Sequence, residues 1–331
     1  MKLLIFHPVK VPVVHYGGTE RVLLWLCQTL TRMGHQVSVF AAPGSTLPDG
    51  IECLTDPDTL RNKVQSFDLI HGFSRLDPNL EAEMEGRVIY TVHGNGMLGE
   101  KFHPNTVFLS RNHARRHGAD AFVYNGIDPD ELLFSNRPRP DRYLYLSKTS
   151  WKVKNLKGAA KISSKAKKPL WIAGGERPYG LRLKTAIRAL LGQDWNWVGS
   201  VDQAEKALFL LKGRALLFPI LWNEPFGLIL VESLMSGTPV LANPYGSLPE
   251  ILEFAPECLM KSEADWISAL KGEVKLPDAN RCRDWAIAHF DQRIMAAAYV
   301  KLYEKILEGL PLNSKNPKTL IGAEDLGAAY A

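Results

Sequence analysis

Short apolar runs alternate with amphipathic stretches from the start of the chain. Residues 3–6 and 37–40 are compact apolar runs, which predict buried strands. Between them, residues 19–33 place apolar side chains on one face of a helix, and Gly34 is its expected stop. Further apolar runs predict strands at 68–71, 88–92, 107–109 and 121–124. Strands that alternate with helices in this way predict a parallel sheet with helices on both faces.

A polar stretch then interrupts the pattern. Residues 136–142 contain two prolines and no apolar side chain, so we expect a linker there. A length of 331 residues also exceeds the usual size of a single core, which favours two doubly wound halves. Such folds bind ligands at the carboxyl ends of strands, so we expect the site in a cleft between the halves. Beyond the linker the runs predict strands at 143–146, 170–173, 195–198, 215–218 and 239–242, and then one helix over 285–310.

Composition narrows the class of protein. Hydrophobic residues make up 46% of the chain and charged residues 23%, as in globular proteins. No apolar run reaches the ~20 residues of a membrane helix, and residues 1–8 are too short for a signal peptide. The four cysteines form no short-spaced pair, which argues against a zinc site or a disulfide framework. A net charge of +5 fits an anionic ligand or a membrane surface but does not indicate nucleic-acid binding.

The most informative segment is 222–239, which reads WNEPFGLILVESLMSGTP. Glu224 follows a buried strand, and Pro225 suits the first turn of a helix. The free amides of residues 226–228 would then favour an anion at the helix N-terminus. Glu232 lies about two turns further on among apolar residues, so it needs a hydrogen-bonding partner. A carboxylate at either position can chelate sugar hydroxyls; the alternative, a helix cap and a solvated glutamate, has equal weight from these residues alone.

Two glutamates with seven residues between them, set in EPFGL and followed by SGTPV, resemble the signature of retaining glycosyltransferases of family 4, in the glycosyl transferases group 1. That family has the GT-B fold. The resemblance covers roughly residues 1–310. It extends to HYGGTERV at 15–22, YTVH at 90–93, YNGID at 124–128, IAGG at 172–175, YGSLPE at 245–250, and HF at 289–290 in the last helix.

The resemblance implies an architecture and an activity. The architecture is two doubly wound Rossmann-like domains whose parallel sheets face a cleft. An acceptor-side domain would comprise residues 1–138, a nucleotide-sugar-binding domain residues 139–295, and residues 296–331 a helix and tail that cross back to the first domain. The activity is retaining transfer of a hexose from a nucleotide-diphosphate sugar, with a UDP-sugar as the first choice. The acceptor would be a hydroxyl of a glycan, a lipid or a small molecule, and neither a metal nor another cofactor would be needed.

The same resemblance implies roles for individual residues. Glu224 would contact hydroxyls of the donor sugar, Glu232 would bind the ribose, and His93 would lie beside the transferred sugar. The other donor contacts that it implies are the backbone amides of Phe226, Gly227 and Leu228 for the diphosphate, Gly17 and Gly18 for close approach of the first domain, and the backbone from Gly199 to Val201 for the base.

Two lysines mark a departure from the family pattern. The family usually has Gly-Arg after the first strand of the second domain, whereas this chain has Ser147-Lys148. Lysine keeps the positive charge but loses the bidentate fork that suits phosphate. Lys154 would be the second diphosphate-binding lysine, and Lys157 is the competing alignment. Together, Lys148 and Lys154 would stabilise the departing diphosphate as a metal ion does in other enzymes.

Three histidine and aspartate motifs are weaker. Residues 56–58 and 128–130 both spell Asp-Pro-Asp, which matches the Asp-x-Asp metal pattern of a different glycosyltransferase fold, but both lie in turn-like contexts. His113 and His117 have the i, i+4 spacing of metal ligands on a helix. No acidic third ligand lies nearby in sequence, so we favour a solvated helix over a metal site.

Two stretches are rich in Lys and Arg. Residues 142–175 contain nine basic residues and no acidic one, and residues 110–116 are also basic. We favour solvated faces for both, with a polyanionic ligand, an acceptor or acidic lipid headgroups as the alternatives. We therefore expect a cytoplasmic protein that binds a nucleotide sugar and a glycan, lipid-linked or small-molecule acceptor, and no nucleic acid. Weak peripheral association with the inner membrane surface stays open.

Two other functions remain open from the sequence. One is a nucleotide-sugar epimerase of the same fold, against which the EPFG segment argues. The other is a nucleotide-sugar-binding protein without turnover, and Lys148 is the feature that gives it weight.

Overall fold

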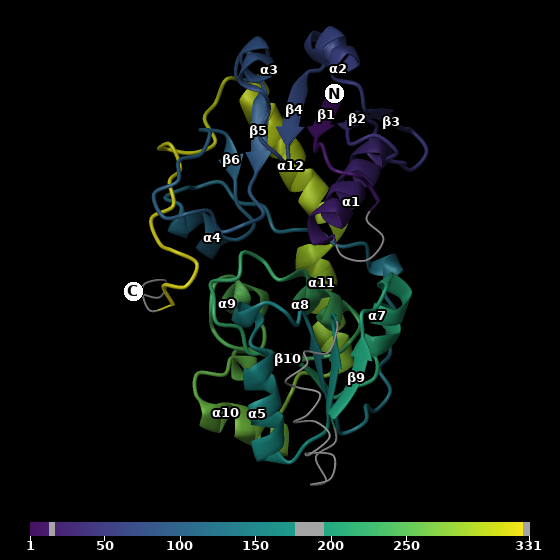
Figure 1. Ribbon diagram of the computed structural model, residues 1–331, viewed down its shortest axis with the longest axis vertical. Coiled ribbons are helices and arrows are strands. Elements are labelled where there is room, and N and C mark those ends of the chain that lie inside the picture. The colour runs from purple at the N-terminus through teal and green to yellow at the C-terminus, as the bar shows by residue number, and fades with distance from the viewer. Residues whose placement is uncertain (13–16, 176–194, 327–331) are drawn as a thin grey trace. The chain divides into compact units, whose positions relative to one another are not determined.

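The computed structural model describes residues 1–12, 17–175 and 195–326. The chain forms two compact units, each built on its own parallel sheet (Figure 1). The first unit comprises Met1–Asp128 and Phe290–Ala323, and the second comprises Pro129–His289 and Glu324–Ala331. The chain therefore leaves the first unit before the expected boundary at 138, and it returns to that unit at Phe290 rather than at 296.

The first unit has a six-stranded sheet in the order β3-β2-β1-β4-β5-β6, in which every pair is parallel. Reversal of strand order beside β1 is the mark of a doubly wound sheet. The strands are β1 (Lys2–Phe6), β2 (Gln36–Phe40), β3 (Ile51–Leu54), β4 (Leu69–Gly72), β5 (Val88–Thr91) and β6 (Thr106–Val107). The helices are α1 (Gly18–Arg32), α2 (Pro57–Lys63), η1 (Val64–Ser66), α3 (Pro78–Glu83), α4 (Arg111–Arg116) and α12 (Gln292–Leu307).

Side chains of β1 alternate between two covered faces. Leu4 and Phe6 belong to a buried cluster that also contains Leu60 of α2 and Leu80 of α3. Leu3 and its neighbours of the same parity point to the other face and are fully buried. There α1 and α12 pack against each other and against the sheet. The prediction of helices on both faces is therefore confirmed for this unit.

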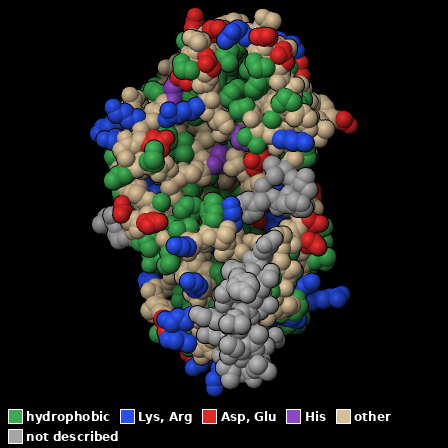
Figure 2. All heavy atoms as spheres, viewed as in Figure 1, with side chains coloured by type: hydrophobic (Ala, Val, Ile, Leu, Met, Phe, Trp, Pro, Cys, Tyr) green, Lys and Arg blue, Asp and Glu red, His purple; other side chains and the backbone are tan. Residues whose placement is uncertain are grey.

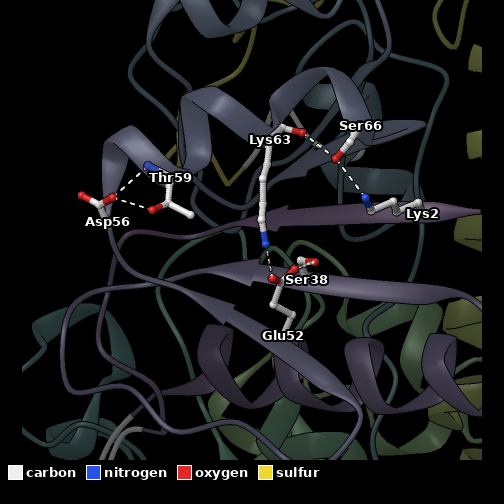
Figure 3. A network of polar contacts seen from close by, with 7 residues as sticks. All are labelled: Lys2, Ser38, Glu52, Asp56, Thr59, Lys63 and Ser66. Atoms are coloured by element: carbon white, nitrogen blue, oxygen red, sulfur yellow. Dashed lines mark hydrogen bonds and ion pairs between the residues drawn. The ribbon is translucent and has the colours of Figure 1, made fainter.

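The sequence pattern missed strand β3, at the edge of the sheet. Only its end residues are buried, so it lacks the apolar run of the central strands. Polar contacts fix it instead: Glu52 accepts from Ser38 of β2 at 2.6 Å and pairs with Lys63 of α2 at 2.5 Å (Figure 3). Asp56, from the first Asp-Pro-Asp motif, caps α2 by accepting from the amide and hydroxyl of Thr59 at 2.8 and 2.6 Å (Figure 3).

Two other predicted elements are wrong. Residues 121–124 form only an isolated bridge between Phe108 and Phe122, because neighbouring backbone amides donate to a side chain of the C-terminal tail instead of to a strand. The single helix predicted over 285–310 is two helices, α11 (Ala279–Phe290) and α12. Asp291 separates them in an extended conformation and caps α12 by accepting from Arg293 N at 2.7 Å.

The second unit has a five-stranded parallel sheet in the order β11-β10-β7-β8-β9. All five strands were predicted, because each is a short, strongly apolar run. They are β7 (Tyr143–Leu146), β8 (Leu170–Ala173), β9 (Trp195–Gly199), β10 (Ala215–Phe218) and β11 (Val240–Ala242). The helices described here are η2 (Pro129–Glu131), η3 (Lys152–Lys154), α5 (Leu156–Ala166), α7 (Gln203–Leu210), α8 (Leu228–Met235), α9 (Leu248–Ile251), η4 (Pro256–Cys258), α10 (Glu263–Lys271) and α11.

Arg139 explains why the expected linker belongs to the second unit. Its guanidinium donates to the carbonyl oxygens of Ser135, Leu210 and Ser236 at 2.9, 3.3 and 2.8 Å. Leu210 ends α7 and Ser236 follows α8, so this arginine satisfies carbonyls at two helix C-termini. Residues 136–142 are therefore anchored to the second unit, and the crossing point moves upstream to Asp128.

The lysine-rich stretch is partly a charged surface. Lys161 and Lys165 of α5 both pair with Glu263 of α10 and are about half exposed. Figure 2 shows Lys and Arg side chains spread over this part of the second unit. None of the helices within the described residues combines the length and the hydropathy needed to cross a bilayer.

Candidate functional site

Glu224 and Lys154 form a buried ion pair beside the carboxyl ends of the central strands of the second unit. Glu224 follows β10, and Lys154 ends η3, which follows β7. The Nζ atom of Lys154 lies 2.6 Å from Oε2 of Glu224, and the two side chains are only 8% and 9% exposed. Trp222 Nε1 donates to the same oxygen at 2.6 Å. The structure therefore brings together two of the predicted catalytic residues.

The environment of Lys154 differs from that of Lys157. Lys154 Nζ lies 4.7 Å from the ring centroid of Trp222 and 5.3 Å from that of Phe218, whereas Lys157 is exposed. Asn155, with a left-handed backbone (φ 54°), caps α5 by accepting from Gly158 N at 3.0 Å. This cap turns the chain so that Lys154 points inward and Lys157 points to solvent.

Lys148 lies next to the same aromatic pair. Its Nζ is 4.8 Å from the ring centroid of Trp151, which packs edge-on against Trp222 at 6.1 Å. Lys148 is half-buried at the end of β7. Lys154 and Trp222 thus contact one carboxylate oxygen of Glu224 directly. Lys148 and Trp151 extend the cluster beyond Trp222. The two tryptophans were not predicted, because an aromatic residue between strands has no sequence pattern of its own.

The start of α8 departs from the prediction. The helix begins at Leu228, and its N-cap is Gly227 with φ 89° and ψ 64°. Pro225 and Phe226 therefore precede the helix, so of the three predicted amides only that of Leu228 lies in the first helical turn. The left-handed conformation of Gly227 is one that only glycine adopts readily. Phe226 is buried, with 2% of its surface exposed.

Gly246 fixes the backbone beneath Glu224. Ser247 N donates to the carbonyl of Glu224 at 2.9 Å, and Ser247 Oγ donates to that of Phe226 at 2.7 Å. A Cβ atom on Gly246 would lie 2.3 Å from both N and O of Glu224, which no relaxation of a side chain could relieve. The glycine of the YGSLPE motif is therefore required by the close approach of two backbone segments.

Glu232 is almost fully buried and forms an ion pair with a lysine. Its side chain is 2% exposed and forms an ion pair with Lys206 of α7, which is 8% exposed. The predicted need for a partner is met, but Lys206 itself was not predicted. A capping box of Asp202 and Glu205 fixes the start of α7 and so the position of Lys206. Its only sequence signal is a basic residue directly before the apolar end of the helix, residues 207–210.

Gly199 and Val201, the predicted seat of the base, lie between β9 and α7. Gly199 is the last residue of β9, with φ 95°, and its carbonyl accepts from Gly174 N at 2.8 Å. Val201 is half-buried just before the cap of α7. From Val201 the chain continues into α7, which contains Lys206, the partner of Glu232.

In the first unit, His93 follows β5 and stacks on Phe73, with ring centroids 5.0 Å apart. Burial lowers the pKa of His93 to about 3, with a smaller contribution from His7, so the ring is neutral at pH 7. Within the part of the chain that the structure describes, its buried Nε2 atom makes no hydrogen bond. The first-unit histidine is thus neutral, and one ring nitrogen can still bond a ligand.

The glycine-rich loop is described only in part. Gly17 is the N-cap of α1 and Gly18 its first residue, whereas His15 and Tyr16 of the motif lie outside the described residues. Glu20, one turn into α1, lies 3.7 Å from His7, and this contact holds the pKa of Glu20 below its usual value. The pairing of Glu20 with His7 was not predicted.

His113 and His117 are not the solvated pair that their spacing suggested. Both are fully buried on α4, and they lie against the segment that follows His93. His113 Nε2 lies 2.9 Å from the carbonyl of Gly94, and His117 Nε2 lies 2.7 Å from that of Asn95. Their role here is to hold the backbone beside His93, which i, i+4 spacing alone cannot reveal.

Asn313, in the C-terminal tail, ties the tail to this part of the first unit. Its side chain accepts from the amides of Asp120 and Ala121 at 2.9 and 3.0 Å. It donates to the carbonyls of Pro104 and Thr106 at 2.7 and 2.9 Å. One side chain therefore satisfies four backbone groups on two different segments.

We expect Asn313→Ala to lower the free energy of unfolding by about 2–3 kcal/mol, because buried backbone groups lose their partners. Thermal unfolding of the first unit should measure this loss. Asn316→Ala, at an exposed position of the same tail, is the matched control and should leave the midpoint unchanged. Equal midpoints for the two variants would show that Asn313 does not anchor the tail.

The two Asp-Pro-Asp motifs lie at a helix cap and at a 3-10 turn. Asp56 is occupied as the cap of α2, and Asp130 lies in the 3-10 turn η2. Within residues 1–12, 17–175 and 195–326, no three His, Cys, Asp or Glu side chains are placed to hold a metal ion.

Part of the second unit matches a known protein family. Residues 134–258, which contain Lys148, Lys154, Glu224 and Glu232, match the family model described as glycosyl transferases group 1. Over 118 residues the chain is 29% identical to an uncharacterized 41.2 kDa protein in the cps region of Klebsiella pneumoniae, a match that covers 33% of this chain. The chain spans 32% and 46% of the length of the two Klebsiella relatives it matches.

Solved structures resemble the whole chain. AviGT4, a glycosyltransferase involved in avilamycin A biosynthesis, is 21% identical with a TM-score of 0.75, over 94% of this chain and 99% of that one. HepE of Anabaena, in complex with UDP and glucose, is 16% identical with a TM-score of 0.60, over 93% and 99%. The chain thus has the two-domain, parallel-sheet fold of GT-B glycosyltransferases, and its residues 134–258 match the glycosyl transferases group 1.

Proposed function

We propose that this protein is a retaining glycosyltransferase that moves a hexose from a nucleotide-diphosphate sugar to a hydroxyl of a glycan, lipid or small-molecule acceptor. The observation that carries the proposal is the buried contact of Lys154 and Trp222 with Oε2 of Glu224. A carboxylate in that setting is fixed in position and can bind sugar hydroxyls, while the lysines beside it offer positive charge to a diphosphate.

In the proposed site, each residue has one task. Glu224 binds hydroxyls of the donor sugar, and Lys148 and Lys154 neutralise the leaving diphosphate together with the start of α8. Glu232 binds the ribose, and the backbone at Gly199–Val201 receives the base. On the first unit, His93 bonds the transferred sugar, and Gly17 and Gly18 allow close approach of the backbone.

The proposed chemistry needs no protein nucleophile. Cleavage of the bond between sugar and diphosphate places positive charge on the sugar ring and negative charge on the leaving group. The acceptor oxygen attacks the face from which the diphosphate departs, and a phosphate oxygen takes the acceptor's proton. The protein contributes by fixed charges and orientation, which stabilise the separated charges without reorganisation.

A panel of nucleotide sugars would test the proposal. We expect one donor, with a UDP-sugar as the first choice, to raise the unfolding midpoint, because ligand at 100 times its dissociation constant stabilises a protein by ~2.7 kcal/mol. Transfer of labelled hexose from that donor to an acceptor panel would then identify the reaction. Donor consumption that yields an epimer without acceptor, or binding without any turnover, would instead support one of the two alternatives.

Lys206 is expected to contribute to nucleotide affinity through Glu232. We expect Lys206→Met to weaken UDP binding about tenfold or more, because an unpaired buried carboxylate repels the anionic nucleotide and loses its orientation. Calorimetry with UDP would measure the change, and Lys206→Arg should retain most of the affinity. Lys212→Met, which removes a lysine just beyond α7, is the control. Unchanged affinity in Lys206→Met would separate this pair from the nucleotide site.

We expect transfer to continue in excess EDTA. Lys148, Lys154 and the start of α8 already offer positive charge to the diphosphate, and Asp56 is engaged as a helix cap. The test is donor turnover with EDTA, followed by addition of magnesium or manganese. Loss of activity that only the metal restores would overturn the proposed charge stabilisation.

A further inference from the structure

Helix α12 is apolar on two faces. On one face, buried residues such as Met295, Tyr299 and Tyr303 pack into the first unit. On the other face, Ile294 is 42% exposed and Leu302 is half-buried at the surface. A helix that is apolar on opposite faces is normally covered on both. The outer face of α12 therefore has the composition of a contact surface.

This face lines a groove of about 590 Å³, which we call the α12 groove. Its floor is formed by Ile294, Ala298 and Leu302 of α12 together with Phe122, from the segment that did not become a strand. All of these residues belong to the first unit, so the groove is complete within that unit.

The rim of the α12 groove is basic. Lys301 and Lys305 border it and are exposed, and among the described residues neither lies within ion-pair distance of a carboxylate. The guanidinium of Arg111 lies 5.9 Å from the ring centroid of Phe122, so a third cation stands at the floor's edge. The two exposed lysines thus give the rim of the apolar floor its positive charge, and Arg111 stands beside the floor.

Among the described residues, the acidic side chains near the groove do not pair with Lys301 or Lys305. Arg293, which also lines the groove, is neutralised by Asp291 through contacts of 2.9 and 2.5 Å. Glu304, on the same helix as the lysines, acts electrostatically on His35, which lies beyond the end of α1. Neither acidic residue is therefore paired with Lys301 or Lys305, and these two lysines keep the rim positively charged.

We propose that the α12 groove docks the protein on an anionic phospholipid bilayer. The lysines and Arg111 would contact lipid phosphates, and the apolar floor would cover lipid groups just below them. Each basic residue near an anionic membrane strengthens binding about fivefold, and partly exposed apolar residues add to it. Because the groove shares no residue with the proposed donor site, this inference is independent of the proposed transfer reaction.

Co-sedimentation of the full chain with lipid vesicles would test the proposal. We expect binding to vesicles of phosphatidylglycerol and phosphatidylcholine in equal parts, little binding to phosphatidylcholine alone, and a decrease with added salt. Lys301→Gln/Lys305→Gln should weaken binding about 25-fold. Lys271→Gln/Lys275→Gln, which removes two exposed lysines from the second unit, is the matched control and should bind as the unaltered protein does.

A second variant tests the apolar floor. Ile294→Ser/Leu302→Ser should weaken vesicle binding further at high salt, where charge contacts are screened, and its unfolding midpoint is measured in parallel because Leu302 is half-buried. Three results would overturn the proposal: no binding of the unaltered protein to anionic vesicles, equal binding by the α12 and control lysine variants, or concentration-dependent dimers that only the α12 variants abolish. Calorimetry with UDP on the same variants reports the proposed donor site separately.

Discussion

Glu224→Gln is expected to lower the rate of sugar transfer about a thousandfold while the protein stays folded. Lys154 and Trp222 both donate to one carboxylate oxygen, Oε2, and the carbonyl oxygen of glutamine can accept both bonds. The substitution thus keeps the local packing and removes the negative charge that binds sugar hydroxyls as charge develops. The buried Lys154 loses its anion, so we also expect a lower unfolding midpoint. Losses of about 10²–10³-fold follow when one such polar contact to a transition state is removed.

The assay is transfer of labelled hexose at saturating donor, with the unfolding midpoint measured in parallel. Glu253→Gln removes an exposed carboxylate a short distance along the same unit and should leave the rate unchanged. Turnover of Glu224→Gln close to that of the unaltered protein, with a lowered midpoint, would mean that Glu224 has a structural role only.

The sequence predicted the sheets well because most of their strands are short apolar runs buried on both faces. Strands such as Tyr143–Leu146 and Leu170–Ala173 need no knowledge of their neighbours to be recognised. Strand β3 could not be found in this way, since polar contacts from other segments hold it in the sheet. The strand predicted at residues 121–124 does not form for the converse reason. These residues are apolar, but the side chain of Asn313 accepts the hydrogen bonds of the amides at their start.

The candidate site divides in a similar way. Glu224 and Glu232 stand in a spacing that is visible in sequence, and the structure gives each a buried position. Their partners were harder to identify. Lys154 was predicted only from the family resemblance, with Lys157 as the competing alignment, and Lys206 was not predicted. Both lysines are far in sequence from the glutamates with which they pair. His113 and His117 show the same limit, since a buried histidine that bonds a carbonyl has no signature in the chain.

Variants of Lys154 test whether Lys154 or Lys157 is the second lysine that binds the diphosphate. Lys154→Ala leaves the buried carboxylate of Glu224 without its cation, and breaking such a pair typically costs about 3–5 kcal/mol. For a unit of this size, that cost corresponds to a fall of about 10 °C in the unfolding midpoint. We expect transfer to be lost as well, because the diphosphate loses one of its positive partners.

A double variant separates the two effects of Lys154. Lys154→Met/Glu224→Gln removes both charges, so it should recover most of the midpoint while transfer stays absent. Lys157→Ala, at an exposed position one helical turn away, should change neither the midpoint nor the rate. The opposite pattern, with Lys157→Ala inactive and Lys154→Ala active, would assign the diphosphate to Lys157 and leave Lys154 as a purely structural partner of Glu224.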